Sequence, residues 1–141
     1  MAGYSGTPLP KKLGIKPGSL VALVDAPPGF TETLGELPPG VEFVPSESGA
    51  VDVIVCFCTN LTELEARFLE LKPLLAFSGG LWIAWRKRER GVPQAINENQ
   101  VREVGLAGGL VDSKVCAIDE AWSGLRFVYR LVDRPPKAAR R

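Results

Sequence analysis

The chain contains no histidine and only three cysteines among its 141 residues. Without an imidazole, neither a Ser-His-Asp triad nor a Cys-His pair can form, and the commonest metal ligand is missing. The cysteines, Cys56, Cys58 and Cys116, are too few for the four-ligand sites that structural zinc prefers, and their odd number does not indicate a disulfide framework. We therefore expect no metal site, and we assign no catalytic residue.

Long hydrophobic runs are missing as well. No apolar stretch approaches the roughly 18 residues that a membrane-spanning helix needs. The first residues also lack the charged and apolar regions of a secretory signal. These patterns predict a cytoplasmic protein with no membrane partner.

The net charge of +1 is small, and it conceals a basic end. Residues 134–141 carry four basic side chains, and without them the chain has 13 basic and 16 acidic residues, a net charge of −3. A body of this charge does not favour nucleic acid as a partner. We predict that residues 134–141 form a disordered basic tail, and that only this tail is suited to RNA, DNA or an acidic partner.

The composition that is present indicates one globular domain. The hydrophobic share is 45%, and 141 residues is the usual size of a single domain. Glycine and proline gather in residues 1–18, in residues 27–39 and near the C-terminus. We therefore predict an N-terminal surface arm over residues 1–18, in which Leu13 and Ile15 dock, and one α/β domain over residues 19–133.

Strands are indicated by short apolar runs between turn signals. The runs over residues 19–25, 50–58 and 81–85 have the pattern of strands that are buried on both faces. Gly79 and Gly80 are expected to form the turn that leads into the last of these. Further strands are predicted over residues 41–44, 110–118 and 125–132, the last with apolar side chains on one face only.

Two helices are indicated by cap spacing. Asn60 precedes Glu63 by three residues and opens an apolar stripe that Pro73 should end. Asn97 and Gln100 repeat this spacing before a segment that stops at Gly108. Strands that alternate with helices predict a small, mostly parallel Rossmann-like sheet flanked by helices, and the last two strands add a C-terminal antiparallel hairpin.

The segments "DVIVCFC" and "LTELEARFLELKPLLAFSGGLWIAW", followed by a helix and a hairpin, resemble the C-terminal half of a class I methyltransferase-like Rossmann fold. The segments "KLGIKPG", "LWIAWRK" and "GLVDSKVCAIDEAWSGLRFVYR" resemble a family of short bacterial proteins of unknown function, over residues 12–130. This resemblance implies a truncated methyltransferase-like fold, and it implies no particular activity.

The first half departs from a working methyltransferase. The stretch "VDAPPGF" keeps Asp25 after the first strand, but Pro27 and Pro28 stand where glycines would let the backbone approach a cofactor. Glu47 reaches the position of a ribose-binding acid only by a detour, and one βα unit is missing between Val44 and Ala50. These departures disfavour S-adenosylmethionine as a cofactor, and it is kept as an alternative.

Candidate binding residues follow the carboxyl ends of the predicted strands, where ligands bind in open α/β sheets. They are Asp25, Cys58, Asn60, Arg86, Lys87, Asp119, Glu120 and Trp122.

This rim has two interpretations. Arg86 or Lys87 holds an anionic group while Trp122 offers a stacking face, or the two cations form plain surface ion pairs with the acids of residues 119–120. Arg88 and Arg90 are expected to be solvated charges. If a thiol is reactive, Cys58 at its strand end is the better candidate, although cysteines in strands are usually small core residues.

Two classes of function follow. The favoured one is a non-catalytic binding or interaction protein on a degenerate methyltransferase-like scaffold, with a small anionic ligand or a protein as its partner. The alternative is a nucleotide- or S-adenosylmethionine-dependent transferase that uses the rim. A homodimer also stays open.

Overall fold

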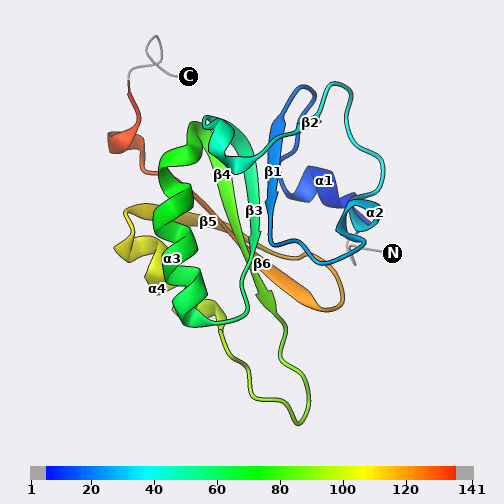
Figure 1. The fold of residues 1–141 in the computed structure, drawn as a ribbon, viewed down its shortest axis with the longest axis vertical. Helices are drawn as coiled ribbons and strands as arrows, with labels where there is room; N and C mark the ends of the chain where they lie inside the picture. The colour runs from blue at the N-terminus through cyan, green and yellow to red at the C-terminus, as the bar shows by residue number, and fades with distance from the viewer. Residues whose placement is uncertain (1–5, 136–141) are drawn as a thin grey trace.

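A six-stranded mixed sheet lies at the centre of the computed structural model, which describes residues 6–135 (Figure 1). The strands are β1 (Leu20–Val24), β2 (Glu42–Phe43), β3 (Val51–Phe57), β4 (Leu75–Arg86), β5 (Leu110–Ala117) and β6 (Trp122–Tyr129). Their order is β2-β1-β3-β4-β6-β5. The first four strands pair in parallel, and β6 runs antiparallel to both β4 and β5. The predicted α/β class with a C-terminal antiparallel hairpin is confirmed.

Two helices, α3 (Leu61–Leu71) and α4 (Glu98–Ala107), cover one face of the sheet. Both begin where the cap spacing predicts: the side chain of Asn60 accepts a hydrogen bond from the Glu63 N–H at 2.8 Å, and Asn97 and Gln100 cap each other reciprocally. A 3₁₀ turn, η2 (Lys72–Leu74), contains Pro73 and ends α3. The local signals of these helices therefore agree with their tertiary positions.

The opposite face is covered by two short helices, α1 (Leu9–Lys12) and α2 (Phe30–Leu34), and by the segment after α1. Leu9, Leu13 and Ile15 are each at most 4% exposed. The indole N–H of Trp82, in the middle of β4, donates a hydrogen bond to the Leu13 carbonyl at 2.9 Å. Much of the expected surface arm is thus part of the core, while the expected tail lies outside the described residues apart from Arg134 and Pro135.

The expected turn at Gly79 and Gly80 is wrong, because both glycines lie inside β4. The pairing of β3 with β4 shifts register near its start, from Val51↔Leu75 to Val53↔Gly80, so β4 accommodates extra residues there. A Cβ at Gly79 would lie 2.5 Å from the Asp52 carbonyl oxygen, so the glycine is needed for the close approach of the two strands.

The expected strand over residues 125–132 is displaced, since β6 begins at Trp122 and ends at Tyr129. Tyr129 pairs with Leu110, the first residue of β5, so the chain beyond it has no partner strand on that side. Residues 131–133 instead form a 3₁₀ turn in which Leu131 is 75% exposed. The alternating apolar pattern of the sequence therefore continues beyond the end of the paired strand β6.

Within the described residues 6–135, no helix combines the length and apolar character needed to cross a bilayer.

The close approach of α4 to the sheet leads to a stability prediction. Gly105 faces the ring of Phe127, and a Cβ built on this glycine would overlap the ring atoms. Gly105→Ala should therefore destabilise the fold by about 1–3 kcal/mol, although alanine is favoured over glycine inside a helix by roughly 0.5–1 kcal/mol. Urea unfolding measures the change.

Leu106→Ala is the matched control, because Leu106 is the next residue of α4 and is 44% exposed. It should change the free energy of unfolding by no more than about 0.5 kcal/mol. A Gly105→Ala variant that is as stable as the wild type would show that α4 does not pack as closely as described.

Candidate functional site

Among the four parallel strands, the direction of the connections reverses once, between β1 and β3. From β1 the chain moves outward to β2 and then crosses back to β3, so the carboxyl ends of β1 and β3 flank a topological switch point. Ligands of open α/β sheets bind at such a point. Asp25 follows β1 there and Cys58 follows β3, as the sequence predicts.

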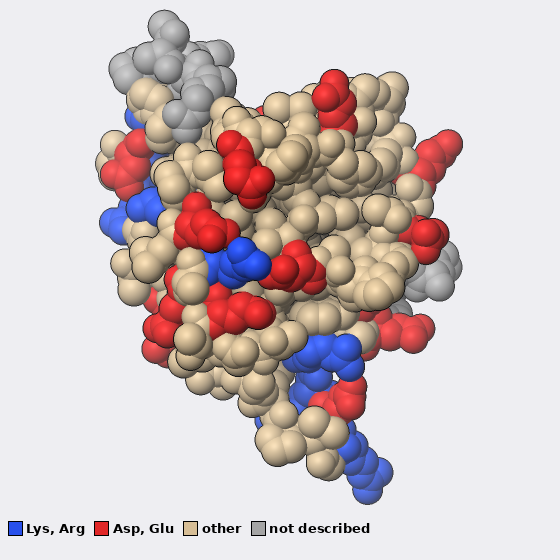
Figure 2. All heavy atoms as spheres, viewed as in Figure 1, with Lys and Arg blue, Asp and Glu red and all other residues tan. Residues whose placement is uncertain are grey.

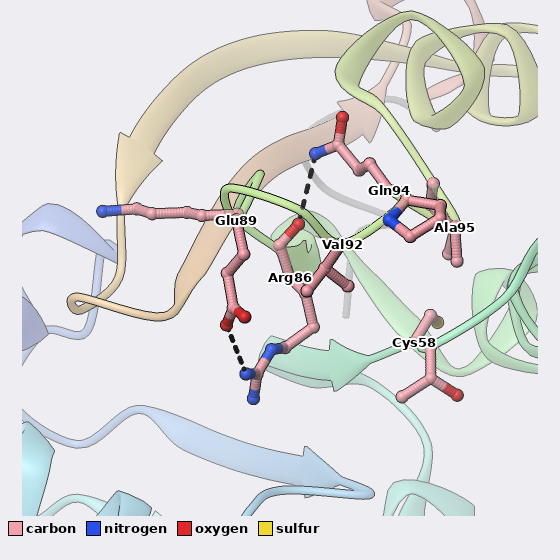
Figure 3. Close-up of a pocket in the computed structure, with 10 residues that line it drawn as sticks. Cys58, Arg86, Glu89, Val92, Gln94 and Ala95 are labelled. Atoms are coloured by element: carbon pink, nitrogen blue, oxygen red, sulfur yellow. Dashed lines mark hydrogen bonds and ion pairs between the residues drawn. The ribbon is translucent and has the colours of Figure 1, made fainter.

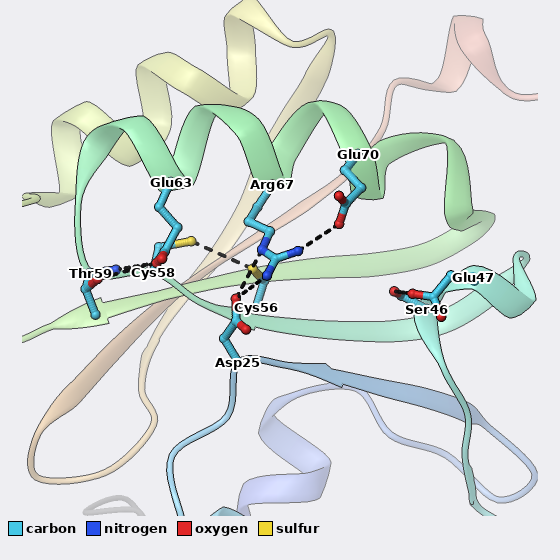
Figure 4. Close-up of polar contacts among 9 residues, drawn as sticks. All are labelled: Asp25, Ser46, Glu47, Cys56, Cys58, Thr59, Glu63, Arg67 and Glu70. Carbon is cyan, nitrogen blue, oxygen red and sulfur yellow. Dashed lines mark hydrogen bonds and ion pairs between the residues drawn. The ribbon is translucent and has the colours of Figure 1, made fainter.

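An ion pair spans this switch point (Figure 4). The Arg67 guanidinium, on α3, lies 2.8 Å from the Asp25 carboxylate and also contacts Glu70 at 2.9 Å. Hydrogen bonding to Glu70, and then to Asp25, raises the pKa of Arg67, while burial acts in the opposite direction. Asp25 has a positive φ of 56°, a conformation that aspartate tolerates better than most residues. The carboxylate of Asp25 is therefore already engaged by α3.

The residues at the switch point do not fit S-adenosylmethionine. Pro27 and Pro28 have no N–H to offer to a ligand after β1. Beyond β2, Glu47 lies in the 3₁₀ turn η1 (Ser46–Ser48), where its carboxylate accepts a hydrogen bond from the Ser46 hydroxyl at 3.0 Å. The two acids expected to hold the cofactor, Asp25 and Glu47, are thus already bonded within the chain. The backbone N–H groups expected after β1 are missing at the two prolines.

A concave site, which we call the rim pocket, lies beside the carboxyl ends of β3 and β4 (Figure 3). It has a volume of about 160 Å³, below the roughly 300–1,000 Å³ of pockets for drug-sized ligands. Its lining comprises Cys58, Thr59, Arg86, Lys87, Glu89, Val92, Pro93, Gln94, Ala95 and Ile96. Figure 2 shows basic side chains gathered on the loop that follows β4, next to this pocket.

Arg86 is the central cation of the rim pocket. Its guanidinium lies 5.4 Å from the ring centre of Trp122 and 3.1 Å from the Glu89 carboxylate. Trp122 is only 7% exposed and packs edge-on against Phe57, so it forms a floor beneath Arg86 and not an open stacking face. The pocket loop is drawn back onto the strand because the Gln94 side chain donates to the Arg86 carbonyl at 3.2 Å.

Two of the other expected rim residues, Asp119 and Asn60, have local partners. Asp119 accepts hydrogen bonds from the N–H groups of Ala121 and Trp122, which stabilises the turn between β5 and β6. Asn60 caps α3, and Glu120 is exposed. The expected ion pair of Arg86 with Asp119 or Glu120 is wrong, because Arg86 pairs with Glu89 of the loop that follows β4. The alternative ion pair through Lys87 stays a prediction.

Cys56 and Cys58 share the face of the sheet that α3 covers, and neither side chain is exposed. Their sulfur atoms lie 3.7 Å apart. The hydrogen bond between them, followed by burial, raises the pKa of the Cys56 thiol far above its ordinary range. Within residues 6–135, no group of three or more potential metal-ligating side chains comes together.

Sequence reasoning missed Arg67 and the loop over residues 92–96. Arg67 carries a usable signal: it lies three residues after Leu64 and one before Phe68, at the edge of the apolar stripe of α3, so it had to lie near the sheet. Ile96, an apolar residue after a charged segment, is 3% exposed and anchors the loop. Nothing in the sequence marked Gln94.

No protein-family model matches the chain, and no curated protein matches its sequence. Solved structures do match its fold. A SAM-dependent methyltransferase from Aquifex aeolicus matches with a TM-score of 0.57 and 22% identity, over 83% of this chain and 85% of the other. A putative type 11 methyltransferase from Sulfolobus solfataricus has a TM-score of 0.57 and 16% identity, over 92% and 94% of the two chains.

The magnesium protoporphyrin IX methyltransferase from Synechocystis PCC 6803, determined with bound SAH, matches with a TM-score of 0.52 and 12% identity, over 81% of this chain and 75% of the other. The fold is therefore that of the Rossmann-like methyltransferases. At these identities the likeness shows the fold alone.

The buried thiols lead to a pH prediction. In the unfolded chain a cysteine ionises near pH 8.5, whereas the raised pKa keeps Cys56 protonated in the folded chain. Since the unfolded state alone loses this proton, the free energy of unfolding should fall as the pH rises above about 8.5. In Cys56→Ala the decline between about pH 8.5 and 10 should be shallower, as measured by urea titrations at each pH.

Cys116→Ala is the control. Burial also raises the pKa of the Cys116 thiol, but the charges of Lys12, Lys114 and Lys87 oppose this rise. This variant should keep most of the alkaline decline. An unchanged pH slope in Cys56→Ala would contradict the assignment to Cys56.

Proposed function

We propose that the chain is a binding protein, without catalysis of its own, that holds a small anionic ligand in the rim pocket. The observation that supports this most directly is the placement of Arg86. Its guanidinium lies over Trp122 at the side of the pocket, and its paired anion, Glu89, belongs to the loop that follows β4.

The Arg86–Glu89 pair is one that a ligand can replace. Both side chains are more than half exposed, at 53% and 55%. Exposed ion pairs contribute only about 0–1 kcal/mol. Little free energy is therefore lost when an anion in the pocket displaces Glu89 from Arg86. The hydrogen bonds that the anion accepts from the guanidinium are charge-assisted.

The pocket also limits the size and chemistry of the ligand. A volume of about 160 Å³ suits a phosphate-sized or short dicarboxylate ligand. Lys87 adds a second cationic side chain to the lining, and Thr59 and Gln94 add neutral polar groups. The buried Cys58 and the apolar Ile96 supply the non-polar part of the wall.

The second candidate is a nucleotide- or S-adenosylmethionine-dependent transferase, which the similarity to methyltransferase structures favours. Against it stand the Asp25–Arg67 ion pair at the switch point and the two prolines after β1. A cytoplasmic location and a homodimer are predictions from the sequence that accompany either proposal.

A ligand screen separates the candidates. Thermal unfolding and isothermal titration are measured with phosphate, succinate, AMP, S-adenosylmethionine and S-adenosylhomocysteine. A small dianion present at 100 times its Kd should stabilise the protein by about 2.7 kcal/mol. Arg86→Ala should lose this stabilisation, and Glu89→Gln should bind the anion more tightly than the wild type, because the competing carboxylate is gone.

Arg88→Ala is the matched control, since Arg88 belongs to the same loop but does not line the rim pocket. It should bind as the wild type does. We also expect the Arg86→Ala, Lys87→Ala double variant to keep its fold; loss of folding would show that the pair is structural. Stabilisation by S-adenosylmethionine and its product, without an effect of the small anions, would favour the transferase instead.

A further inference from the structure

A cationic cluster lies on the face of the sheet opposite α3 and α4, away from the rim pocket. We call it the Arg126 shelf, and it consists of Lys12, Gly14, Gly80, Ser113, Lys114 and Arg126. Within it, the register of β5 and β6 places Lys114 directly opposite Arg126. Like charges opposite each other destabilise a strand pair, so the sequence retains an unfavourable arrangement at this position.

Glycines form the floor on which Arg126 lies. A Cβ added at Gly80 would overlap Nε of Arg126 and would lie 2.8 Å from its Cζ. A Cβ at Gly14 would lie 4.0 Å from the same Nε. The guanidinium thus lies flat along β4, in a position that a side chain at residue 80 would occupy.

The Arg126 guanidinium has little to neutralise it. Within residues 6–135 its side chain forms no ion pair, and it donates one hydrogen bond, to the Ser113 hydroxyl at 3.2 Å. Burial, and then the charge of Arg134, lower the pKa of Arg126. The side chain has five N–H donors in a fixed plane, so most of them are available to an external acceptor.

The shelf is also open to solvent. Ser113 and Lys114 are exposed, and Arg126 is half-buried. Lys12 marks the edge of the covering N-terminal segment, where its carbonyl accepts a hydrogen bond from the Lys114 ammonium at 3.3 Å. Figure 2 shows the opposite side of the molecule, where acidic side chains gather over α3 and α4. The shelf lies on the side of the sheet away from these acidic side chains.

We propose that the Arg126 shelf is a docking site for an extended acidic peptide segment of a protein partner. Carboxylates match the planar donor fork of an arginine and bind it in a bidentate manner. Neighbouring strands lie about 4.8 Å apart, and alternate side chains of an extended segment are about 6.6 Å apart. Two acidic residues at alternate positions can therefore reach Arg126 and Lys114 together.

The charge distribution favours an acidic protein over a nucleic acid. Polyanionic nucleic acids are bound by broad basic faces, whereas this cluster is small and the chain without residues 134–141 has a net charge of −3. The Arg126 shelf is separate from the rim pocket. A negative result for peptide binding would therefore not contradict the proposed binding of an anion in the rim pocket.

The test uses the full chain and a fluorescein-labelled, N-acetylated octaglutamate peptide as the probe, with binding followed by fluorescence anisotropy. Arg126→Gln removes the charge and should weaken binding at least fivefold. Gly80→Ala should weaken it to a similar extent, since the new methyl group displaces the guanidinium while the net charge stays the same. Arg88→Gln, which removes one charge from the loop after β4, should bind within twofold of the wild type.

Circular dichroism and thermal unfolding first establish that each variant is folded; if Gly80→Ala is not, Arg126→Lys takes its place, because it keeps the charge and loses the planar fork. The proposal would be overturned if the wild type, Arg126→Gln and the second variant (Gly80→Ala or Arg126→Lys) all bound the peptide with equal affinity. It would also be overturned if the wild-type chain did not bind the peptide. Tighter binding of an RNA oligonucleotide of equal charge would overturn it in favour of nucleic acid.

Discussion

The structure depends on the burial of both faces of β3 and β4. Ile54 and Cys56 pack beneath α3, while Val53, Val55 and Trp82 point to the other side, and all are at most 3% exposed. Two strands that are apolar on both faces need a covering layer on each side. One layer is provided by the two long helices. The other is built from very short helices and from the N-terminal segment, which is why Leu13 is as deeply buried as any strand residue.

This constraint also determines where polar groups can gather. The carboxyl ends of the parallel strands meet at one edge of the sheet, and the chain places Asp25, Cys58 and Arg86 there. At the switch point itself, Arg67 of α3 engages Asp25, and the open pocket is displaced toward β4 and its loop. A fold that resembles that of methyltransferases thus carries a pocket, the rim pocket, in which the cation Arg86 is the central charged group. That combination is the physical basis of the proposed anion binding.

The covering layer on the α1 side has a further effect, since its edge at Lys12 and Gly14 lies beside β5 and β6. The half-buried Arg126 and the exposed Lys114 lie beside that edge. Arg102 pairs with Asp112 on the other face of the sheet, whereas Arg126 forms no ion pair within the described residues.

The sequence by itself determined the class of fold, both long helices with their caps, and the edge of the sheet where polar residues meet. These features rest on local signals: capping side chains, apolar periodicity and the geometry of parallel strands. Only the tertiary structure decided that Gly79 and Gly80 lie within β4, that Arg67 engages Asp25 and that Gln94 closes the loop of the rim pocket. Each of these depends on the distance between segments that are separate in the sequence, and on register, which composition and periodicity do not specify.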